Sequence, residues 1–267
     1  MKTLLSALIV LALACPLYAD VVLLSEDFGS GGTPAVGSAL RGYNGWFGYA
    51  TDDVLKISDA VADVGQSAAF NAPYGTGYPA GRNWPEVSKS FSHFGGGPVA
   101  GEVYTLSATI VASTSGYHGM GVELSTTTTG WADGTFVTAW YGPAQGGYGN
   151  KIWAGSSIDG AMAYSTPALT NGVAYDMKAV VSTASTDFYY KVHTDSTWTL
   201  MGTGSGQTLS SFQYVNIIGV VGTYNWSGTG IPLDTVVLSS NIPEPSTLAL
   251  LATGLLGLLC YAWRKRR

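Results

Sequence analysis

The sequence predicts an all-β protein, an antiparallel β-sandwich, and three observations lead to this fold class. Short runs rich in Val, Thr, Tyr and Ile alternate with clusters of Gly, Asn, Asp and Ser, as strands alternate with turns. No long stretch shows the 3.6-residue period of an amphipathic helix. The 36 glycines are spread along the whole chain. Because each half-apolar strand must bury one face, two packed antiparallel sheets are the economical arrangement.

The first 19 residues have the features of a secretory signal peptide. Lys2 precedes an apolar run from Leu4 to Ala14, and the small residue Ala19 is the expected cleavage position. Cys15 also allows a lipoprotein reading, although the residues before it lack the Leu that usually stands three positions ahead of a lipidated cysteine. We therefore expect an exported chain that begins at Asp20.

Residues 20–241 are expected to form one β-sandwich domain. This body has seven basic and sixteen acidic side chains, so its net charge is −9. An acidic body with dispersed bases argues against nucleic acid and anionic lipid as partners. The two cysteines, Cys15 and Cys260, both lie outside the body, so its stability must come from its core and not from a disulfide.

Several strands can be placed from the pattern of residues. Residues 102–113 alternate, with Tyr104, Leu106, Ala108 and Ile110 on one side. Residues 175–182 and 187–195 flank a short turn and form an expected hairpin that carries Lys178 and Lys191 on its solvent face. Residues 212–222 and 232–240 supply two more strands, in a total of about a dozen.

The start of the body resembles concanavalin A-like (laminin G-like) jelly rolls of bacterial surface proteins. Such domains begin with an acidic-Phe strand followed by a G-x-x-L-x-G-x-x-G-W pattern, and they often close with an Asp-x-Val-x-Leu strand, similar to residues 233–239 here. The matching residues are Glu26, Asp27, Phe28, Gly37, Leu40, Gly42, Asn44, Gly45 and Trp46. The resemblance implies a jelly-roll sandwich over most of the body.

A structural calcium ion is one cofactor to consider, since calcium takes several hard oxygen ligands. In some jelly rolls the first and last strands are neighbours, so Glu26, Asp27 and Asp234 could share an ion. The alternative is that these acids are strand-end residues that face water. The three histidines are isolated in the sequence and give no transition-metal pattern.

The body lacks the residue patterns of the enzymes that use this fold, so we expect no catalytic activity. Jelly-roll glucanases place carboxylates at alternate positions of one strand, but none of the four glutamates of the body has an acid two residues on. No Tyr, His and Lys cluster suggests a polysaccharide lyase, and no G-x-S-x-G motif is present.

Carbohydrate binding remains an open alternative, because aromatic rings stack on sugar faces. Trp84 and Trp226 lie in Gly- and Asn-rich segments that we expect to be loops, where they could contact a sugar. The other reading is that tryptophans fill the core of a sandwich that has no disulfide.

The C-terminal segment predicts a transmembrane helix at residues 247–263. These 17 uncharged residues would span about 26 Å, at the short limit for a membrane helix. Tyr261 and Trp263 stand at the interface end, and four bases follow: Arg264, Lys265, Arg266 and Arg267. Clustered bases favour the cytoplasm, which leaves the body outside, as the signal peptide also requires.

Pro243-Glu244-Pro245, a Ser-Thr pair, one apolar span and a terminal basic cluster follow one another over residues 242–267. This arrangement resembles the PEP-CTERM sorting signal, whose implied partner is exosortase, a multi-pass membrane transpeptidase. The prolines lack N–H donors and disfavour helix and strand, so we expect the motif to be extended and separate from the membrane span. A plain membrane anchor with a chance Pro-Glu-Pro turn is the alternative.

Together these features predict an exported protein that passes through an inner-membrane intermediate and is then sorted by exosortase to the cell surface or matrix. We expect a structural or adhesive role in exopolysaccharide or biofilm; the alternative is a lectin-like module.

Overall fold

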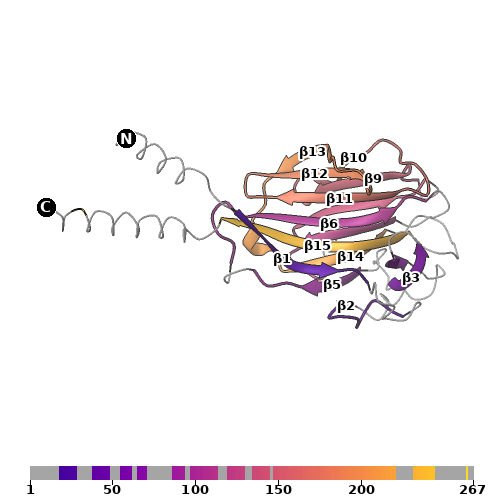
Figure 1. Ribbon diagram of the computed structural model, residues 1–267, viewed down its shortest axis with the longest axis horizontal. Coiled ribbons are helices and arrows are strands. Elements are labelled where there is room, and N and C mark those ends of the chain that lie inside the picture. The colour runs from indigo at the N-terminus through magenta and orange to yellow at the C-terminus, as the bar shows by residue number, and fades with distance from the viewer. Residues whose placement is uncertain are drawn as a thin grey trace.

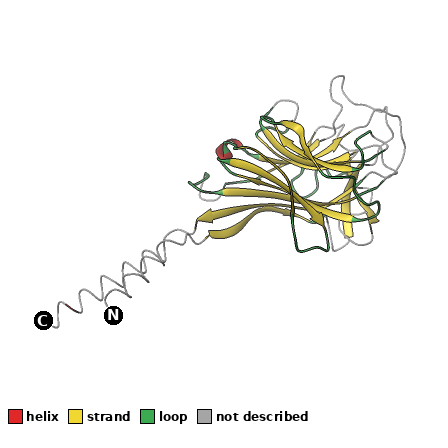
Figure 2. Ribbon diagram, turned by 90° about the horizontal axis from the view of Figure 1, so that it is seen from above, coloured by secondary structure: helices red, strands yellow, loops and turns green. Residues whose placement is uncertain are grey.

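The computed structural model describes residues 18–28, 38–48, 55–61, 65–70, 86–93, 97–113, 119–129, 134–144, 147–220, 231–243 and Trp263. Within these residues the chain forms two antiparallel sheets that pack face to face, with almost no helix (Figures 1 and 2). The prediction of an all-β antiparallel sandwich is confirmed.

The first sheet, sheet A, has eight strands in the described part of the chain. Their order is β13-β12-β11-β6-β15-β4-β3, and β1 pairs with β15 beside this path. The strands are β1 (Tyr18–Glu26), β3 (Leu55–Val61), β4 (Gly65–Phe70), β6 (Val103–Val111), β11 (Ala174–Val181), β12 (Ser185–Val192), β13 (Thr199–Ser205) and β15 (Pro232–Pro243).

The second sheet, sheet B, has seven strands among the described residues, in the order β10-β9-β8-β7-β14-β5-β2. The strands are β2 (Phe47–Gly48), β5 (Glu86–Ser90), β7 (Gly119–Ser125), β8 (Phe136–Gly142), β9 (Lys151–Ser156), β10 (Gly160–Ser165) and β14 (Tyr214–Val220). One turn of 3₁₀ helix, η3 (Leu209–Ser211), precedes β14.

The strands predicted from the sequence are present, although their bounds differ by a few residues. Tyr104, Leu106, Ala108 and Ile110 of β6 are all buried, as the alternation predicts. β11 and β12 form the expected hairpin, with Asp176 opposite Lys191. The same alternation in each sheet sends one set of side chains inward, and these apolar side chains fill the single core between the two layers.

β15 changes its neighbour part of the way along. Its first residues, Pro232 and Leu233, pair with β4, whereas Val236 to Pro243 pair with β1. Between these parts the register against β6 shifts at a bulge from Asp234 to Val237, where Thr235 has a φ of 50°. The bulge bends the strand, so that β4 and β1 share one edge of β15 in turn. The first and last strands, β1 and β15, are thus neighbours, as expected (Figure 1).

Candidate functional site

The two predicted processing positions lie at one end of the sandwich, which we call the exit end and define by residues 18–20 and 241–243. β1 and β15 run antiparallel there, with Tyr18 opposite Pro243, Ala19 opposite Ile242 and Asp20 opposite Asn241. Figure 1 shows the two strands side by side. The predicted signal-peptidase position and the start of the sorting signal are therefore neighbours in space.

A buried carboxylate holds β15 just before the exit end. Glu102 is 2% exposed; its Oε2 accepts a 2.7 Å hydrogen bond from the backbone N–H of Val99, and its Oε1 accepts one from the Ser240 hydroxyl. Burial raises the pKa of the neighbouring Tyr104 hydroxyl, and the charge of Glu102 adds to the effect. Because a buried carboxylate must be hydrogen-bonded, these contacts fix Ser240 relative to β6.

The support of β15 changes beyond Ser240. Asn241 is paired on both sides, with Val103 of β6 and with Asp20 of β1. The pairing with β6 ends there, while the pairing with β1 continues to Ile242 and Pro243. Proline was expected to disfavour strand, yet Pro243 is the last residue of β15, a position where a proline without an N–H donor is tolerated.

The other residues of the predicted sorting signal lie outside the described residues. These are Glu244, Pro245, Arg264, Lys265, Arg266 and Arg267. The proposed span 247–263 is likewise outside them, apart from Trp263. In the described part of the chain, no helix has the length and apolar character needed to cross a membrane.

Glu26, a predicted calcium ligand, has a structural role. The carboxylate is 3% exposed, and its Oε2 accepts hydrogen bonds from Asn44 Nδ2 at 2.7 Å, Trp46 Nε1 at 3.2 Å and Lys89 Nζ at 3.3 Å. The turn that carries Asn44 and Trp46 depends on glycines, since Gly42 and Gly45 have φ values of 89° and 82°. The acidic residue, the glycines and the tryptophan of the sequence motif thus act together to close this turn onto the end of β1.

Asp27 and Asp234 lie near one another, without Glu26 as a third ligand. Asp234 is 4% exposed, and burial raises its pKa from 3.8 to about 7, with the negative charge of Asp27 acting in the same direction. A 2.7 Å hydrogen bond from the Thr235 N–H to Asp234 Oδ1 opposes the shift. Among the residues that the structure describes, no three His, Cys, Asp or Glu side chains are arranged to hold a metal ion. The calcium ion stays a prediction.

The two candidate sugar-contacting residues, Trp84 and Trp226, lie outside the described residues. Of the described tryptophans, Trp46 and Trp140 are buried, whereas Trp153 of β9 and Trp198 in the loop before β13 are partly exposed. The ammonium group of Lys178 lies over the Trp198 ring, 4.2 Å from its centroid. Trp198 lies on the hairpin face where the sequence places the two lysines.

Sequence reasoning missed a polar row across the outer face of sheet B. The residues Thr138, Glu123, Asn216 and Ser88 stand opposite one another on β8, β7, β14 and β5. Asn216 Nδ2 donates to Glu123 Oε1 at 3.0 Å, although the two residues are 93 positions apart in the sequence. No spacing within one strand could reveal this pair, because the sheet creates it.

This polar row is fully covered, although it lies on an outer face. Asn216 Nδ2 also donates to the carbonyl of Thr127 at 3.2 Å, and the Ser88 hydroxyl donates to that of Thr128 at 3.2 Å. Segment 126–129 therefore folds back over the sheet, and Glu123 and Asn216 are 0% exposed. The row as it stands is a structural network under a loop and not an open cleft.

An aromatic cluster adjoins the covered row, at Trp140, Tyr148 and Trp153. The two tryptophan rings are stacked with centroids 6.4 Å apart, and Tyr148 meets Trp140 edge-on at 5.0 Å. Gly119 and Gly121 of β7 make room for it, since a Cβ at either position would overlap Trp140 or its strand. Trp153 is the partly exposed member, with the Lys151 ammonium 5.7 Å from its ring centroid.

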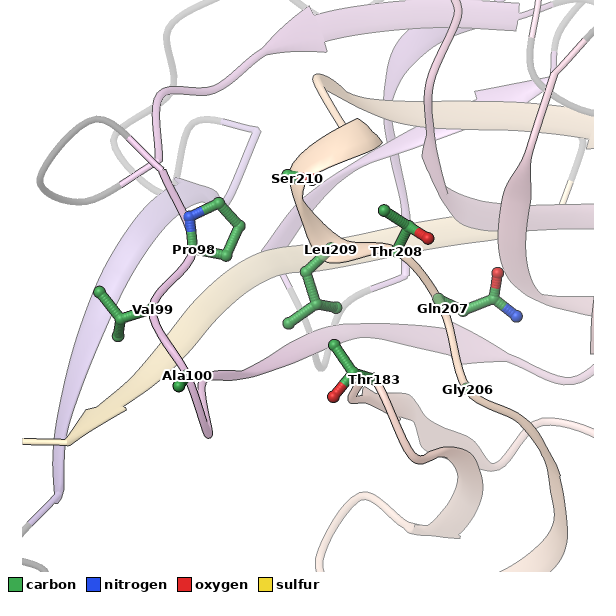
Figure 3. Close-up of a pocket in the computed structure, with 9 residues that line it drawn as sticks. All are labelled: Pro98, Val99, Ala100, Thr183, Gly206, Gln207, Thr208, Leu209 and Ser210. Atoms are coloured by element: carbon green, nitrogen blue, oxygen red, sulfur yellow. The ribbon is translucent and has the colours of Figure 1, made fainter.

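A pocket of about 400 Å³ lies beside the exit end (Figure 3). Its walls are the turn at residues 98–100, Thr183 from the β11–β12 turn, and residues 206–210 leading into η3. The 98–100 wall is the turn that Glu102 binds, so the pocket and the end of β15 share one support. The lining holds no charged side chain.

Comparisons with known proteins find similarities for two parts of the chain, the C-terminal segment and the β-sandwich. Residues 241–267 match the family model of the PEP-CTERM protein-sorting motif. A search among curated proteins finds no match.

Two solved structures illustrate the fold of the body. The basic winged bean lectin, solved with Tn-antigen, has a TM-score of 0.51 and 9% identity, covering 85% of this chain and 100% of that one. The endo-1,3-beta-glucanase from Streptomyces sioyaensis has a TM-score of 0.51 and 12% identity, covering 85% and 98%. At such identities the likeness shows the fold alone. The chain therefore carries a PEP-CTERM protein-sorting motif at residues 241–267, following a β-sandwich of the lectin-like jelly-roll type.

Proposed function

We propose that this protein is a structural or adhesive component of an extracellular exopolysaccharide or biofilm matrix, delivered by exosortase. The observation that carries the proposal is the sorting-motif match at residues 241–267, which marks a secreted protein for the cell surface. Export by the signal peptide 1–19 and a transient inner-membrane stage with helix 247–263 in the bilayer complete the route. The low density of charge, with 11% charged residues, suits a surface protein of this kind.

The sorting step is tested by Glu244→Ala in the full-length chain in its native cell. The variant is expected to accumulate at full length in the inner membrane, because the only charge in the Pro-Glu-Pro tripeptide is lost. Ser246→Ala is the matched control and should be sorted normally. Cell fractionation and intact mass measure the outcome, and normal processing of Glu244→Ala would refute the sorting proposal.

A lectin-like role is the second candidate, supported by the jelly-roll fold and by the partly exposed ring of Trp153 beside Lys151. Aromatic faces of this kind stack on the C–H surface of sugar rings. The full-length protein on a glycan array should then show saturable binding that is lost in Trp84→Ala, Trp226→Ala or Trp153→Ala. Trp198→Ala, in the loop before β13, is the control; absence of binding to any glycan would leave the matrix role alone.

We further propose that the body has no catalytic activity. The supporting observation is the state of Glu123, whose carboxylate accepts a hydrogen bond from Asn216 and is covered by segment 126–129. Incubation with β-glucans and alginate should release no reducing ends and no unsaturated products. Release that disappears in Glu123→Gln would overturn this part of the proposal.

A further inference from the structure

The two neighbours of β15 end at different points. On one side, pairing with β6 stops at Asn241, opposite Val103. On the other side, pairing with β1 continues for two more residues, Ile242 opposite Ala19 and Pro243 opposite Tyr18. Among the described residues, the start of the sorting signal is therefore held in the sheet only by residues 18 and 19.

The body holds β15 firmly only as far as Asn241. Ser240 is 0% exposed and bonded to the buried Glu102, and Asn241 has a strand on each side. Beyond it, Pro243 contributes no N–H to a ladder. The end of β15 is therefore paired on one side only, and Pro243 supplies no N–H to that pairing. Such a strand end separates from the sheet readily once its one neighbouring strand is lost.

The two residues that hold the sorting signal are those that signal-peptide removal takes away. The expected cleavage hydrolyses the Ala19–Asp20 peptide bond, so that water supplies a hydroxyl to the Ala19 carboxyl and a proton to the Asp20 amine. The new first residue, Asp20, stands opposite Asn241, the last residue that is paired on both sides. Ile242 and Pro243 are then left without any strand partner among the described residues.

We propose that N-terminal processing releases the C-terminal sorting signal: while Tyr18 and Ala19 remain, β1 holds Ile242 and Pro243 in sheet A, and cleavage after Ala19 frees them for the transpeptidase. This inference rests on the proposed function, since it concerns access to the same motif. A processing enzyme that binds its substrate as an extended segment needs the backbone groups of that segment unpaired. The fold thus imposes an order on the two steps, with export completed before sorting begins.

The test uses the full-length chain in its native cell with Ala19→Leu, which replaces the small residue that signal peptidase requires. Intact mass confirms that the N-terminal segment is retained. Pulse-chase measurement of the loss of the C-terminal end should then show processing slowed by about tenfold or more, because only the unpaired fraction of the motif can bind.

A second variant separates strand pairing from mere retention at the membrane. It combines Ala19→Leu with six Gly and Ser residues inserted between Asn241 and Ile242, which can carry the motif about 20 Å beyond the strand end. Processing should return to within about twofold of the chain with the insertion alone, since residues 18 and 19 then face the inserted residues.

Each outcome bears on one proposal. Normal C-terminal processing of Ala19→Leu would overturn the ordering, and so would a block that the insertion fails to relieve, because pairing would not then be its cause. Neither result affects the proposed function, which depends on Glu244→Ala. Normal sorting of Glu244→Ala would remove the proposed function itself.

Discussion

Single residues near the ends of β1 and β15 connect these strands to neighbouring segments. Glu26 is the example at the inner end, where one buried carboxylate joins β1, the turn at residues 42–46 and β5. A group with partners on three segments stabilises each of them, and the loss of its charge leaves buried donors unpaired.

Glu26→Gln is expected to lower the free energy of unfolding by about 2–3 kcal/mol, because the Lys89 ammonium loses its counter-charge and Trp46 Nε1 its strong acceptor. Chemical denaturation of the secreted protein measures this. The control Asp195→Asn removes an exposed carboxylate and should change stability by less than about 0.5 kcal/mol. Equal effects of the two substitutions would contradict the role given to Glu26.

Asp234 makes stability depend on pH in a direction unusual for a carboxylate. Its pKa of about 7 in the folded protein lies above its unfolded value of 3.8, so the folded state binds the proton more tightly. The stabilisation of the folded state by the proton on Asp234 is therefore full below about pH 4. It declines as the pH rises toward 7 and is absent above about pH 7. Thermal melts of Asp234→Asn should lack this decline and exceed the wild type in melting temperature at pH 8; a parallel decline in the variant would exclude Asp234 as its source.

The calcium hypothesis can be tested at the same residue. At pH 8, Asp234 is above its pKa of about 7, and a bound cation would relieve the repulsion that the charge of Asp27 exerts on it. Calcium should then raise the melting temperature modestly at pH 8 and less at pH 5, and Asp234→Asn should not respond. A melt that chelator leaves unchanged would end the hypothesis.

At the scale of elements, the bulge in β15 lets one strand serve two neighbours. Thr235 is exposed and has a φ of 50°, in the left-handed region that a β-branched residue adopts at a cost. Leu233, Val236 and Leu238 are buried. The spacing between these inward-facing residues is three positions and then two, whereas a regular strand has a spacing of two throughout. This irregular interval is the signal in the sequence that could have located the bulge.

Thr235→Gly is expected to raise the free energy of unfolding by about 0.5–1 kcal/mol, since glycine adopts the left-handed conformation without a steric penalty. Thr199→Gly, at an exposed position of β13 with ordinary strand geometry, should instead lower it by a similar amount. Denaturant titration compares the two variants, and destabilisation by both would show that Thr235 is unstrained.

Sequence reasoning placed elements whose evidence is local. The alternation of β6, the β11–β12 hairpin and the Gly-rich turn before Trp46 depend on neighbours within a few residues. The Glu123–Asn216 contact and the partnership of Glu26 with Lys89 join distant segments, so only the assembled sheets bring them together. The covering of sheet B by segment 126–129 has no periodic signature, because a loop that folds back follows no repeat.

At the scale of the whole molecule, the sorting motif was predicted from the sequence because its elements are consecutive. Its relation to the other end of the chain was not, since strand register decides which residues of β1 face Ile242 and Pro243. The prolines were expected to disfavour strand, but the last residue of β15 is Pro243, at a position that needs no N–H from it.

The antiparallel β1–β15 pair also determines how the mature domain responds to mechanical load. Tension between Asp20 and Ser239 would peel these strands apart one pair at a time, whereas tension between Asn171 and Ser239 would load the pairings of β6, β11 and β15 together, in shear. Single-molecule pulling through cysteines substituted at these positions, in a body with no cysteine of its own, should give the lower peak force for the first geometry. Equal peak forces would contradict the peeling geometry.

In the proposed arrangement the mature protein begins at Asp20 and is attached to its surroundings through its C-terminal end, so no load is applied at Asp20. A load that enters at the start of β11 would then pass through the pairings of β6, β11 and β15 in shear. Peeling of β1 from β15 requires a load at Asp20, which this arrangement does not apply.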